Sequence, residues 1–150
     1  MKLEDEIKQD KFHSQYHKLM INLLFTGNWV YYHNKKFLKR YGISPEQFNV
    51  LRILRGQYPK PSSINLLNER MLDRMSNVSR LVEKLRIKNL LKRSECPKDR
   101  RQVDILITEE GLALLKQLDT DIKQLEEMFK TISEGEAATL NALLDKLRGE

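Results

Sequence analysis

The 150-residue chain has the length of a single domain, and its 40% apolar residues are enough to form a hydrophobic core. With 32% charged and only 7% aromatic residues, the composition favours an elongated helical protein over a β-sandwich or barrel. No apolar run approaches the roughly 20 residues that span a bilayer, and the polar N-terminus lacks the apolar stretch of a signal peptide. We therefore expect a cytoplasmic protein that does not bind membranes.

Metal-binding and catalytic signals are weak. The only cysteine, Cys96, cannot form an intramolecular disulfide, which agrees with a reducing compartment. His13 and His17 share a helix face, but a structural zinc site usually takes four Cys or His ligands. We also find no convincing pair of carboxylates, nucleophile with a base, or glycine-rich phosphate loop. The sequence therefore predicts no metal site, no cofactor, no catalytic residue and no enzymatic activity.

Positive charge is concentrated in about a fifth of the chain. The segment from Arg74 to Val103 has ten basic and three acidic residues, a local charge of +7, while the whole chain carries +6. Such a concentration is typical of a surface that binds a polyanion. The alternative is an ordinary solvated basic surface.

The first forty residues are expected to form one long helix, because apolar residues recur at helical spacing and Tyr41-Gly42 supplies a stop. The apolar residues of this pattern are Phe12, Tyr16, Leu19, Leu23 and Val30. Ser44-Pro45-Glu46-Gln47 then has the serine, the proline and the glutamine of a capping box, which predicts the start of a second helix.

Two short helices should follow the break at Gly56 and Pro59-Lys60-Pro61. Ser62 or Ser63 caps the first, which runs from Ile64 to about Met71. The second, Ser76 to Lys88, is amphipathic. Its apolar stripe is Val78, Leu81, Val82 and Leu85, and its polar face is Asn77, Arg80, Lys84 and Lys88. Asn89 suits the left-handed residue that ends such a helix.

The last third of the chain predicts a hairpin and two helices. Residues 90–93 and 103–107 alternate like short strands, and the basic segment 94–102 forms the loop between them. Thr108 caps a helix with a coiled-coil-like seam, and Ser133-Glu134-Gly135-Glu136 is a capping box that opens the last helix. The seam is Leu115, Leu118, Ile122, Leu125, Phe129 and Ile132, and the last apolar face is Leu140, Leu143, Leu144 and Leu147.

Three short helices followed by a hairpin is the order of a winged helix-turn-helix, which places its last short helix in the major groove of DNA. Arg80 and Lys84 could then reach phosphates or guanine edges, and Ser76, Asn77 and Ser79 lie at the end of that helix where close base contact is made. The alternative is a surface helix of a helical bundle.

The hairpin tip contains Lys98, Asp99, Arg100 and Arg101. We expect Asp99 to hold one of the two guanidinium groups in a fixed orientation, which would lower the entropy lost when that arginine enters a narrow minor groove. The alternative is an exposed ion pair worth well under about 1 kcal/mol.

The same residues carry a family resemblance. The runs NVSRLVEKLRIKNLLKR and CPKDRRQVDILITEEG resemble the recognition helix, the wing and the following helix start of the MarR regulators. Ser79 and Arg80 match the family's Thr/Ser-Arg pair, and Asp99 and Arg101 match its Asp-x-Arg pair. The chain departs from the family pattern at Asn89, where glycine is usual, and at Ile107, where leucine is usual.

The resemblance implies a mainly α fold with a small β-hairpin, in which residues 44–111 form the winged helix-turn-helix lobe and residues 1–41 and 112–150 form dimerisation helices. It also implies a homodimeric regulator, a repressor, on a pseudo-palindromic site in double-stranded DNA. The two rival functions are a winged-helix protein-interaction module and a nonspecific nucleoid-binding protein.

Members of the family commonly bind small anionic effectors, often aromatic or phenolic, between the dimerisation helices and the lobe. By this resemblance Trp29, Tyr32, His33 and Phe48 are candidate effector contacts, and the alternative is that they belong to the core or the dimer interface. Family peroxide sensors carry their cysteine in the N-terminal helix. Because Cys96 lies in the wing instead, the resemblance argues against a redox switch.

Overall fold

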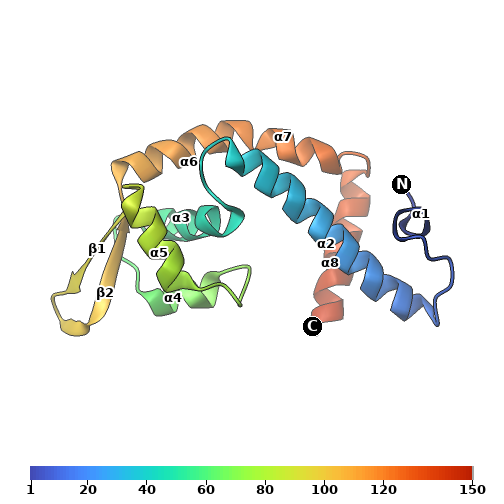
Figure 1. The fold of residues 1–150 in the computed structure, drawn as a ribbon, viewed down its shortest axis with the longest axis horizontal. Helices are drawn as coiled ribbons and strands as arrows, with labels where there is room; N and C mark the ends of the chain where they lie inside the picture. Colours follow the sequence, from blue (N-terminus) through green and yellow to red (C-terminus); the bar gives the residue numbers. More distant parts are fainter. Residues whose placement is uncertain (150) are drawn as a thin grey trace.

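The computed structural model describes residues 1–149, except the side chain of Arg100. The fold is mainly helical with one two-stranded antiparallel sheet, which confirms the predicted fold class. Figure 1 shows a lobe that carries the hairpin at one end and long helices that project from it. The elements are α1 (Leu3–Ile7), α2 (Gln15–Lys39), α3 (Pro45–Gln57), α4 (Ile64–Arg70), α5 (Val78–Ile87), β1 (Leu91–Cys96), β2 (Asp99–Ile107), α6 (Glu109–Asp121), α7 (Lys123–Glu126), η1 (Glu127–Phe129) and α8 (Glu134–Arg148).

The lobe encloses the hydrophobic core, to which the end of α2, α3, α4, α5, the base of the hairpin and α6 contribute. The capping box predicted at Ser44 is present: its hydroxyl accepts a hydrogen bond from the main-chain N–H of Gln47, 3.2 Å away, and the Gln47 side chain accepts one from Ser44 N–H. Ser63 caps α4 by the same kind of bond. These caps set the directions in which α3 and α4 bring their apolar faces together. The most deeply buried side chains are Leu38, Val50, Leu51, Leu54, Leu67, Val82, Leu85, Leu91, Ile105, Leu115 and Leu118.

The hairpin is longer than the alternation predicts, because pairing starts at Leu91 opposite Ile107 and continues to Cys96 opposite Asp99. The register shifts between Glu95 and Cys96, and the predicted loop shrinks to the turn at Pro97-Lys98. Beyond its base the hairpin stands in solvent, so its outer residues need no apolar partner and show no alternation. The main-chain pairing of the two strands therefore extends further along the chain than the alternating residues from which the strands are predicted.

The prediction of one helix over the first forty residues is wrong. Residue Lys8 adopts a left-handed conformation (φ 56°) and ends α1, and α2 starts only after Ser14, whose hydroxyl accepts a hydrogen bond from His17 N–H. Phe12, placed in the predicted stripe, lies in the connection between the two helices. The predicted stop at Tyr41-Gly42 is confirmed, since α2 ends at Lys39 and Gly42 has φ 71°.

The predicted seam of the helix after Thr108 divides into two parts. Leu115 and Leu118 are completely buried in the core of the lobe, whereas Phe129 is 46% and Ile132 39% exposed. The helix itself is interrupted at Ile122 and ends at Phe129, before the seam does. The first half of the seam is therefore packed within the chain, and only the second half is free to contact another molecule.

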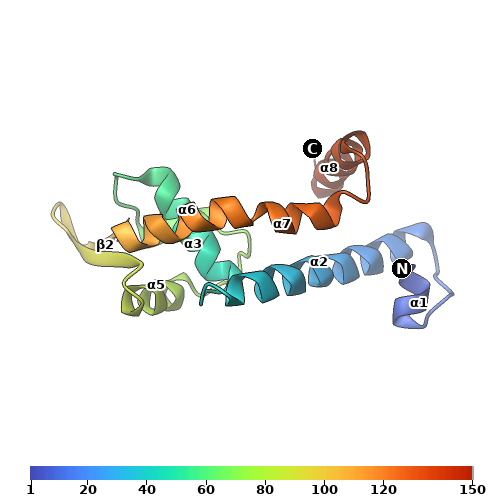
Figure 2. The ribbon, with the colours of Figure 1, turned by 90° about the horizontal axis from the view of Figure 1, so that it is seen from above.

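The long helices extend away from the lobe. Figure 2 shows α2 extending from the lobe in the same direction as α7, which it contacts, with α8 turning off at the far end. The Tyr41 hydroxyl donates to the Asp121 carboxylate, and the rings of Trp29 and Phe129 lie 6.4 Å apart, so both ends of this pairing are held by side chains. Among residues 1–149, no helix combines the length and the apolar character needed to cross a membrane.

Candidate nucleic-acid interface and adjacent cleft

Helix α5 presents a polar face to solvent because its apolar face anchors it in the lobe. Val78, Val82 and Leu85 are buried, with at most 3% of their surface exposed. The predicted contacts Ser79, Arg80 and Lys84 are all exposed on the other side. Packing therefore determines which side chains of α5 are available to a partner, and two of those three are cationic.

The residues that precede α5 form its cap. The Asn77 side chain accepts a hydrogen bond from Arg80 N–H at 3.1 Å, which satisfies a main-chain donor of the first turn. Ser76 donates to the Asp73 carboxylate at 3.2 Å, and the same carboxylate accepts from Met75 N–H at 2.9 Å. The predicted base contacts Ser76 and Asn77 thus also shape the turn between α4 and α5.

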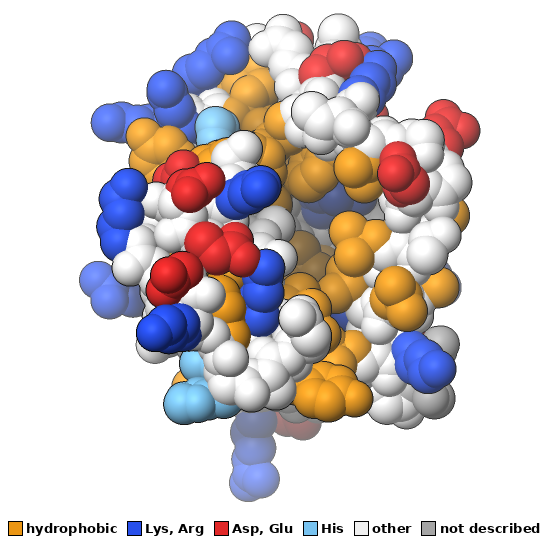
Figure 3. Space-filling view, turned by 90° about the vertical axis from the view of Figure 1, so that its right-hand side faces the viewer, with side chains coloured by type: hydrophobic (Ala, Val, Ile, Leu, Met, Phe, Trp, Pro, Cys, Tyr) orange, Lys and Arg blue, Asp and Glu red, His pale blue; other side chains and the backbone are white. Residues whose placement is uncertain are grey.

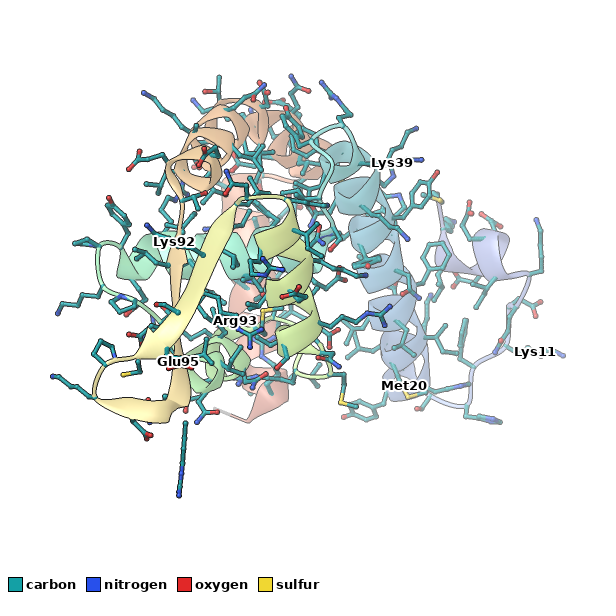
Figure 4. All side chains as sticks on the ribbon, turned by 60° about the vertical axis from the view of Figure 1, so that its left-hand side comes forward. Lys11, Met20, Lys39, Lys92, Arg93 and Glu95 are labelled. Atoms are coloured by element: carbon teal, nitrogen blue, oxygen red, sulfur yellow. The ribbon has the colours of Figure 1, made fainter. Side chains whose placement is uncertain are left out.

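Three exposed cations of the basic segment already have partners within the chain. The Lys88 ammonium donates to the Gly42 carbonyl and to the Gln47 side chain, which ties the end of α5 to the start of α3. Glu83 lies 2.8 Å from Arg86 and 3.8 Å from Arg93 on β1, a strand that flanks α5 in Figure 4. The hydrogen bond from Arg86 lowers the pKa of Glu83 and keeps it ionised. Sequence reasoning placed Lys88 on the polar face and missed this network.

At the hairpin tip, Lys98, Asp99 and Arg101 are exposed. The Asp99 carboxylate accepts a hydrogen bond from the Arg101 main-chain N–H at 2.9 Å. We predicted that Asp99 would hold a guanidinium; for Arg101 the bond is to the main chain instead, so the carboxylate shapes the turn. The predicted contact Arg100 lies outside the side chains that the structure describes.

The position of the hairpin relative to α5 depends on the junction with α6. The Thr108 hydroxyl accepts from Gly111 N–H at 3.1 Å and donates to the Asn89 carbonyl at 2.7 Å, which links the end of α5 to the start of α6. Gly111 packs so closely that a Cβ atom there would lie 2.6 Å from Ile107 Cγ1 and even nearer the Leu90 carbonyl oxygen. Only glycine fits, which explains the last residue of the ITEEG motif. Asn89 has φ 58°, as predicted.

A cleft of about 420 Å³ opens between the long helices and the lobe. Of the four predicted effector contacts, Phe48 lines it, while Trp29, Tyr32 and His33 lie elsewhere on α2. The His33 ring packs 5.0 Å from Trp29 and 5.6 Å from Tyr32, both edge-on. The cleft is lined by Gly27, Val30, Tyr31, Asn34, Pro45, Glu46, Phe48, Asn49, Arg52, Met71, Leu72, Asp73, Ile122, Leu125, Glu126, Met128 and Phe129.

The missed lining residues of α2 are a helical stripe, since Gly27, Val30, Tyr31 and Asn34 are spaced by three, one and three positions. Val30 belongs to the apolar pattern of the N-terminal helix, so extending that pattern towards Asn34 could have identified this face. The aromatic side chains alone pointed to the neighbouring face.

One hydrogen bond spans the cleft from α2 to α3. The Tyr31 hydroxyl donates to a Glu46 carboxylate oxygen at 2.7 Å. This bond, partial burial and the negative charges of Glu46 and Asp73 raise the pKa of Tyr31 to about 12. Partial burial acts to raise the pKa of Glu46, but the hydrogen bonds from Tyr31 and from the main chain outweigh it and lower that pKa.

A further surface is apolar and uncovered. Figure 3 looks at the end of the molecule where α1 and α8 lie, and hydrophobic side chains gather there around a hollow. The large exposed apolar residues of α2, η1, α8 and the connection between η1 and α8 are Tyr16, Leu19, Met20, Leu24, Tyr31, Tyr32, Phe129, Ile132, Leu140, Leu143 and Leu147. Soluble monomers rarely expose so many apolar side chains on contiguous helices.

A model of the MarR family matches residues 43–103, from the start of the lobe to the middle of the hairpin's second strand. The HTH-type transcriptional regulator PecS of Dickeya dadantii is 30% identical over 115 residues, which are 75% of this chain and 69% of PecS. The HTH-type transcriptional regulator MhqR of Bacillus subtilis is 29% identical over 131 residues, which are 87% of this chain and 89% of MhqR.

Solved structures share the fold. The organohalide-sensing regulator RdhR-CbdbA1625 in its 2,4-dichlorophenol-bound form superposes with a TM-score of 0.82 at 21% identity, over 93% of this chain and 85% of its own. The MepR–DNA complex of S. aureus superposes with a TM-score of 0.73 at 22% identity, over 91% of this chain and 97% of its own. These proteins have the same lobe and the same projecting helices.

Proposed function

Because the chain belongs to the MarR family, we propose that it is a transcriptional repressor that binds a pseudo-palindromic site in double-stranded DNA as a homodimer and is released by a small effector. The relatives it resembles are named as transcriptional regulators and not as enzymes. A role on DNA also supports a cytoplasmic location for the protein.

The observation that carries this proposal is the polar face of α5. Arg80 and Lys84 are exposed there, and α5 is fixed in the lobe by the Lys88 and Glu83 contacts. In the proposed complex α5 enters the major groove, where Arg80 reads guanine and Ser76, Asn77 and Ser79 approach the bases. The MepR–DNA complex gives a precedent in a chain of the same fold.

The hairpin supplies the second contact. Lys98 would neutralise a phosphate, and Arg100 and Arg101 would follow the minor groove beside it. The hydrogen bond from Arg101 N–H to Asp99 supports this role, because it fixes the backbone from which the arginine projects.

A homodimer is supported by the uncovered apolar side chains of α2 and α8. We propose residues 1–41 and 112–150 as the dimerisation helices and residues 44–111 as the DNA-binding lobe. Within this division, the start of α6 also completes the core of the lobe through Leu115 and Leu118. Two lobes held by one interface would meet half-sites about one helical turn apart.

The test is fluorescence anisotropy with duplexes selected from a random library, at two salt concentrations. We expect selection to converge on an inverted repeat. Arg80→Ala should relax sequence preference and cost about 1–3 kcal/mol, Lys84→Ala should weaken binding to all duplexes and reduce the salt slope by about 1, and Arg101→Ala should lose most of the affinity. Lys116→Ala removes one exposed charge of α6 away from this face and is the matched control.

Each rival function predicts a different result. A nonspecific nucleoid-binding protein would bind every duplex alike, with no motif after selection. A protein-interaction module would bind no duplex in a manner that depends on Arg80. Either result would refute the proposed repressor.

A further inference from the structure

One side chain beside the proposed DNA contacts is apolar and almost entirely exposed. Met75, in the turn that leads into α5, has 91% of its surface in solvent. Single exposed apolar residues are ordinary on proteins, so exposure alone does not distinguish Met75. Its position does, because Met75 stands two residues before Asn77, the cap of the helix end that enters the major groove in the proposed complex. Figure 1 shows the start of α5 and the hairpin tip at the same, lower edge of the lobe.

The main chain around Met75 is held by its neighbours. The Asp73 carboxylate accepts a hydrogen bond from Met75 N–H at 2.9 Å and another from the Ser76 hydroxyl at 3.2 Å. The Arg74 guanidinium turns back to the Asn68 carbonyl of α4, 3.4 Å away. The polar side chains of the turn thus bond to the protein itself, and the methionine projects into solvent. Because the turn already has this shape, little main-chain entropy would be lost when it meets DNA.

A second exposed apolar residue of the same turn contacts a different surface. Leu72 is 90% exposed and borders the cleft beside α2, whereas Met75 lies outside that lining. The Leu72 N–H donates to the Asn49 side chain at 2.8 Å, which ties this part of the turn to α3. The turn therefore presents one apolar side chain to the cleft and the other beside the start of α5.

The major groove offers an apolar side chain one chemical partner. Base edges there carry hydrogen-bond donors and acceptors, and their one apolar group is the C5 methyl of thymine. A methionine pressed against donors, acceptors or phosphates would desolvate them without giving a hydrogen bond in return. Its unbranched side chain is flexible enough to adjust to a methyl group.

We propose that Met75 reads thymine, by packing its side chain against the C5 methyl of one thymine in each half-site of the DNA. This inference rests on the proposed DNA binding and adds a base preference to it. Arg80, Ser76 and Asn77 cannot supply that preference through hydrogen bonds, because the methyl group neither donates nor accepts one.

The experiment replaces thymine by deoxyuridine, which lacks only the C5 methyl group, in the duplex selected for the wild type. Each thymine is replaced in turn, in both half-sites together, and binding is measured by fluorescence anisotropy. We expect one position at which the wild type loses affinity about 16-fold, because each of the two half-sites loses the burial of one carbon group, worth about fourfold.

Variants assign this loss to Met75. In Met75→Ala the loss at that position should shrink below about twofold, whereas Met75→Leu, which stays apolar, should keep most of it. Leu72→Ala is the matched control, because it removes an equally exposed apolar side chain from the same turn and should behave like the wild type. Since both side chains are exposed, these substitutions should leave the fold intact.

Every other outcome overturns the proposal. If the deoxyuridine loss persists in Met75→Ala or vanishes in Leu72→Ala, a different side chain contacts the methyl group. If the wild type responds to no thymine, no methyl group is read. These results leave selective DNA binding intact and refute the role of Met75 alone, whereas a selection that yields no preferred duplex refutes both this role and the proposed function.

Discussion

The DNA-binding lobe and the projecting helices differ in how completely each is packed. In the lobe, apolar side chains of α3, α4, α5 and β2 are buried against one another. In α8, by contrast, no residue of Glu134–Arg148 is fully buried, and Leu143 is 57% exposed. The lobe buries its apolar side chains within the chain, whereas α8 leaves its apolar side chains exposed, where a partner could cover them.

This difference separates two kinds of apolar pattern in one chain. An apolar stripe on α5 indicates packing inside the lobe, whereas the equally regular stripe on α8 indicates association. The helix α6 belongs to both classes, because its first half is buried in the lobe and its continuation is exposed. The comparison predicts that substitutions in α8 change assembly, and that substitutions in the lobe change stability.

The largest effect is expected from Leu143→Glu combined with Leu147→Glu. The double variant places two charges on the uncovered face of α8 and should weaken dimerisation at least about 100-fold, since each side chain loses the burial that a partner would provide. Sedimentation equilibrium measures the dimer dissociation constant. Ile87→Glu, on the exposed surface of the lobe, is the control and should remain dimeric. A double variant that dimerises like the wild type would place the interface elsewhere.

Within the lobe, Gly111→Ala should have the largest effect on stability. The added methyl group meets the Leu90 carbonyl oxygen and Ile107, and a main-chain atom cannot move aside as a flexible side chain can. We expect a loss of about 3 kcal/mol in the free energy of unfolding, measured by urea denaturation.

The control for this variant is Gly56→Ala in α3, where an added Cβ meets nothing within 4 Å. That substitution should raise stability by about 0.5–1 kcal/mol, because alanine favours a helix over glycine. Similar effects of the two alanines would show that close packing is not the reason for Gly111.

The elements that could be predicted from sequence are those with local causes. Ser44, Thr108 and Ser133 cap helices as predicted, because a cap needs only the next three residues. Ser14 is a cap of the same kind, and its signal was in the sequence, but the apolar pattern that continues through Phe12 concealed the break.

The cleft could not be predicted in this way, because its lining comes from α2, α3, the turn before α5 and α7. Which face of α2 meets α3 depends on how the two helices pack, and the spacing of aromatic residues favoured Tyr32 and His33 over Val30 and Tyr31. Likewise, the sequence places Lys88 on the polar face of its helix, but its hydrogen bonds to Gly42 and Gln47 depend on residues more than forty positions away.

A smaller effect on stability is expected when the pH is raised. Because the folded-state pKa of Tyr31, about 12, lies above the ordinary value of 10.0, the fold favours the neutral phenol. This contribution to stability is fully present below pH 10 and is lost as the pH rises towards 12. Tyrosinate difference absorbance between wild type and Tyr31→Phe should show one tyrosine titrating near pH 12. In Glu46→Gln, which removes the negative charge beside the hydroxyl, the same titration should move back towards pH 10; an unchanged titration would contradict the assigned cause.

The smallest effect on the free energy of unfolding is expected from Asn89→Gly. Asn89 follows α5 with φ 58°, a conformation that costs asparagine little and glycine less. In the described structure, the hydrogen bonds of Asn89 involve only its main chain. Its N–H donates to the Arg86 carbonyl, and its carbonyl accepts from the Thr108 hydroxyl. Glycine retains both bonds and should stabilise the lobe by about 0.5 kcal/mol in urea denaturation. A loss of stability would instead assign the Asn89 side chain a role at the junction of α5, the hairpin and α6.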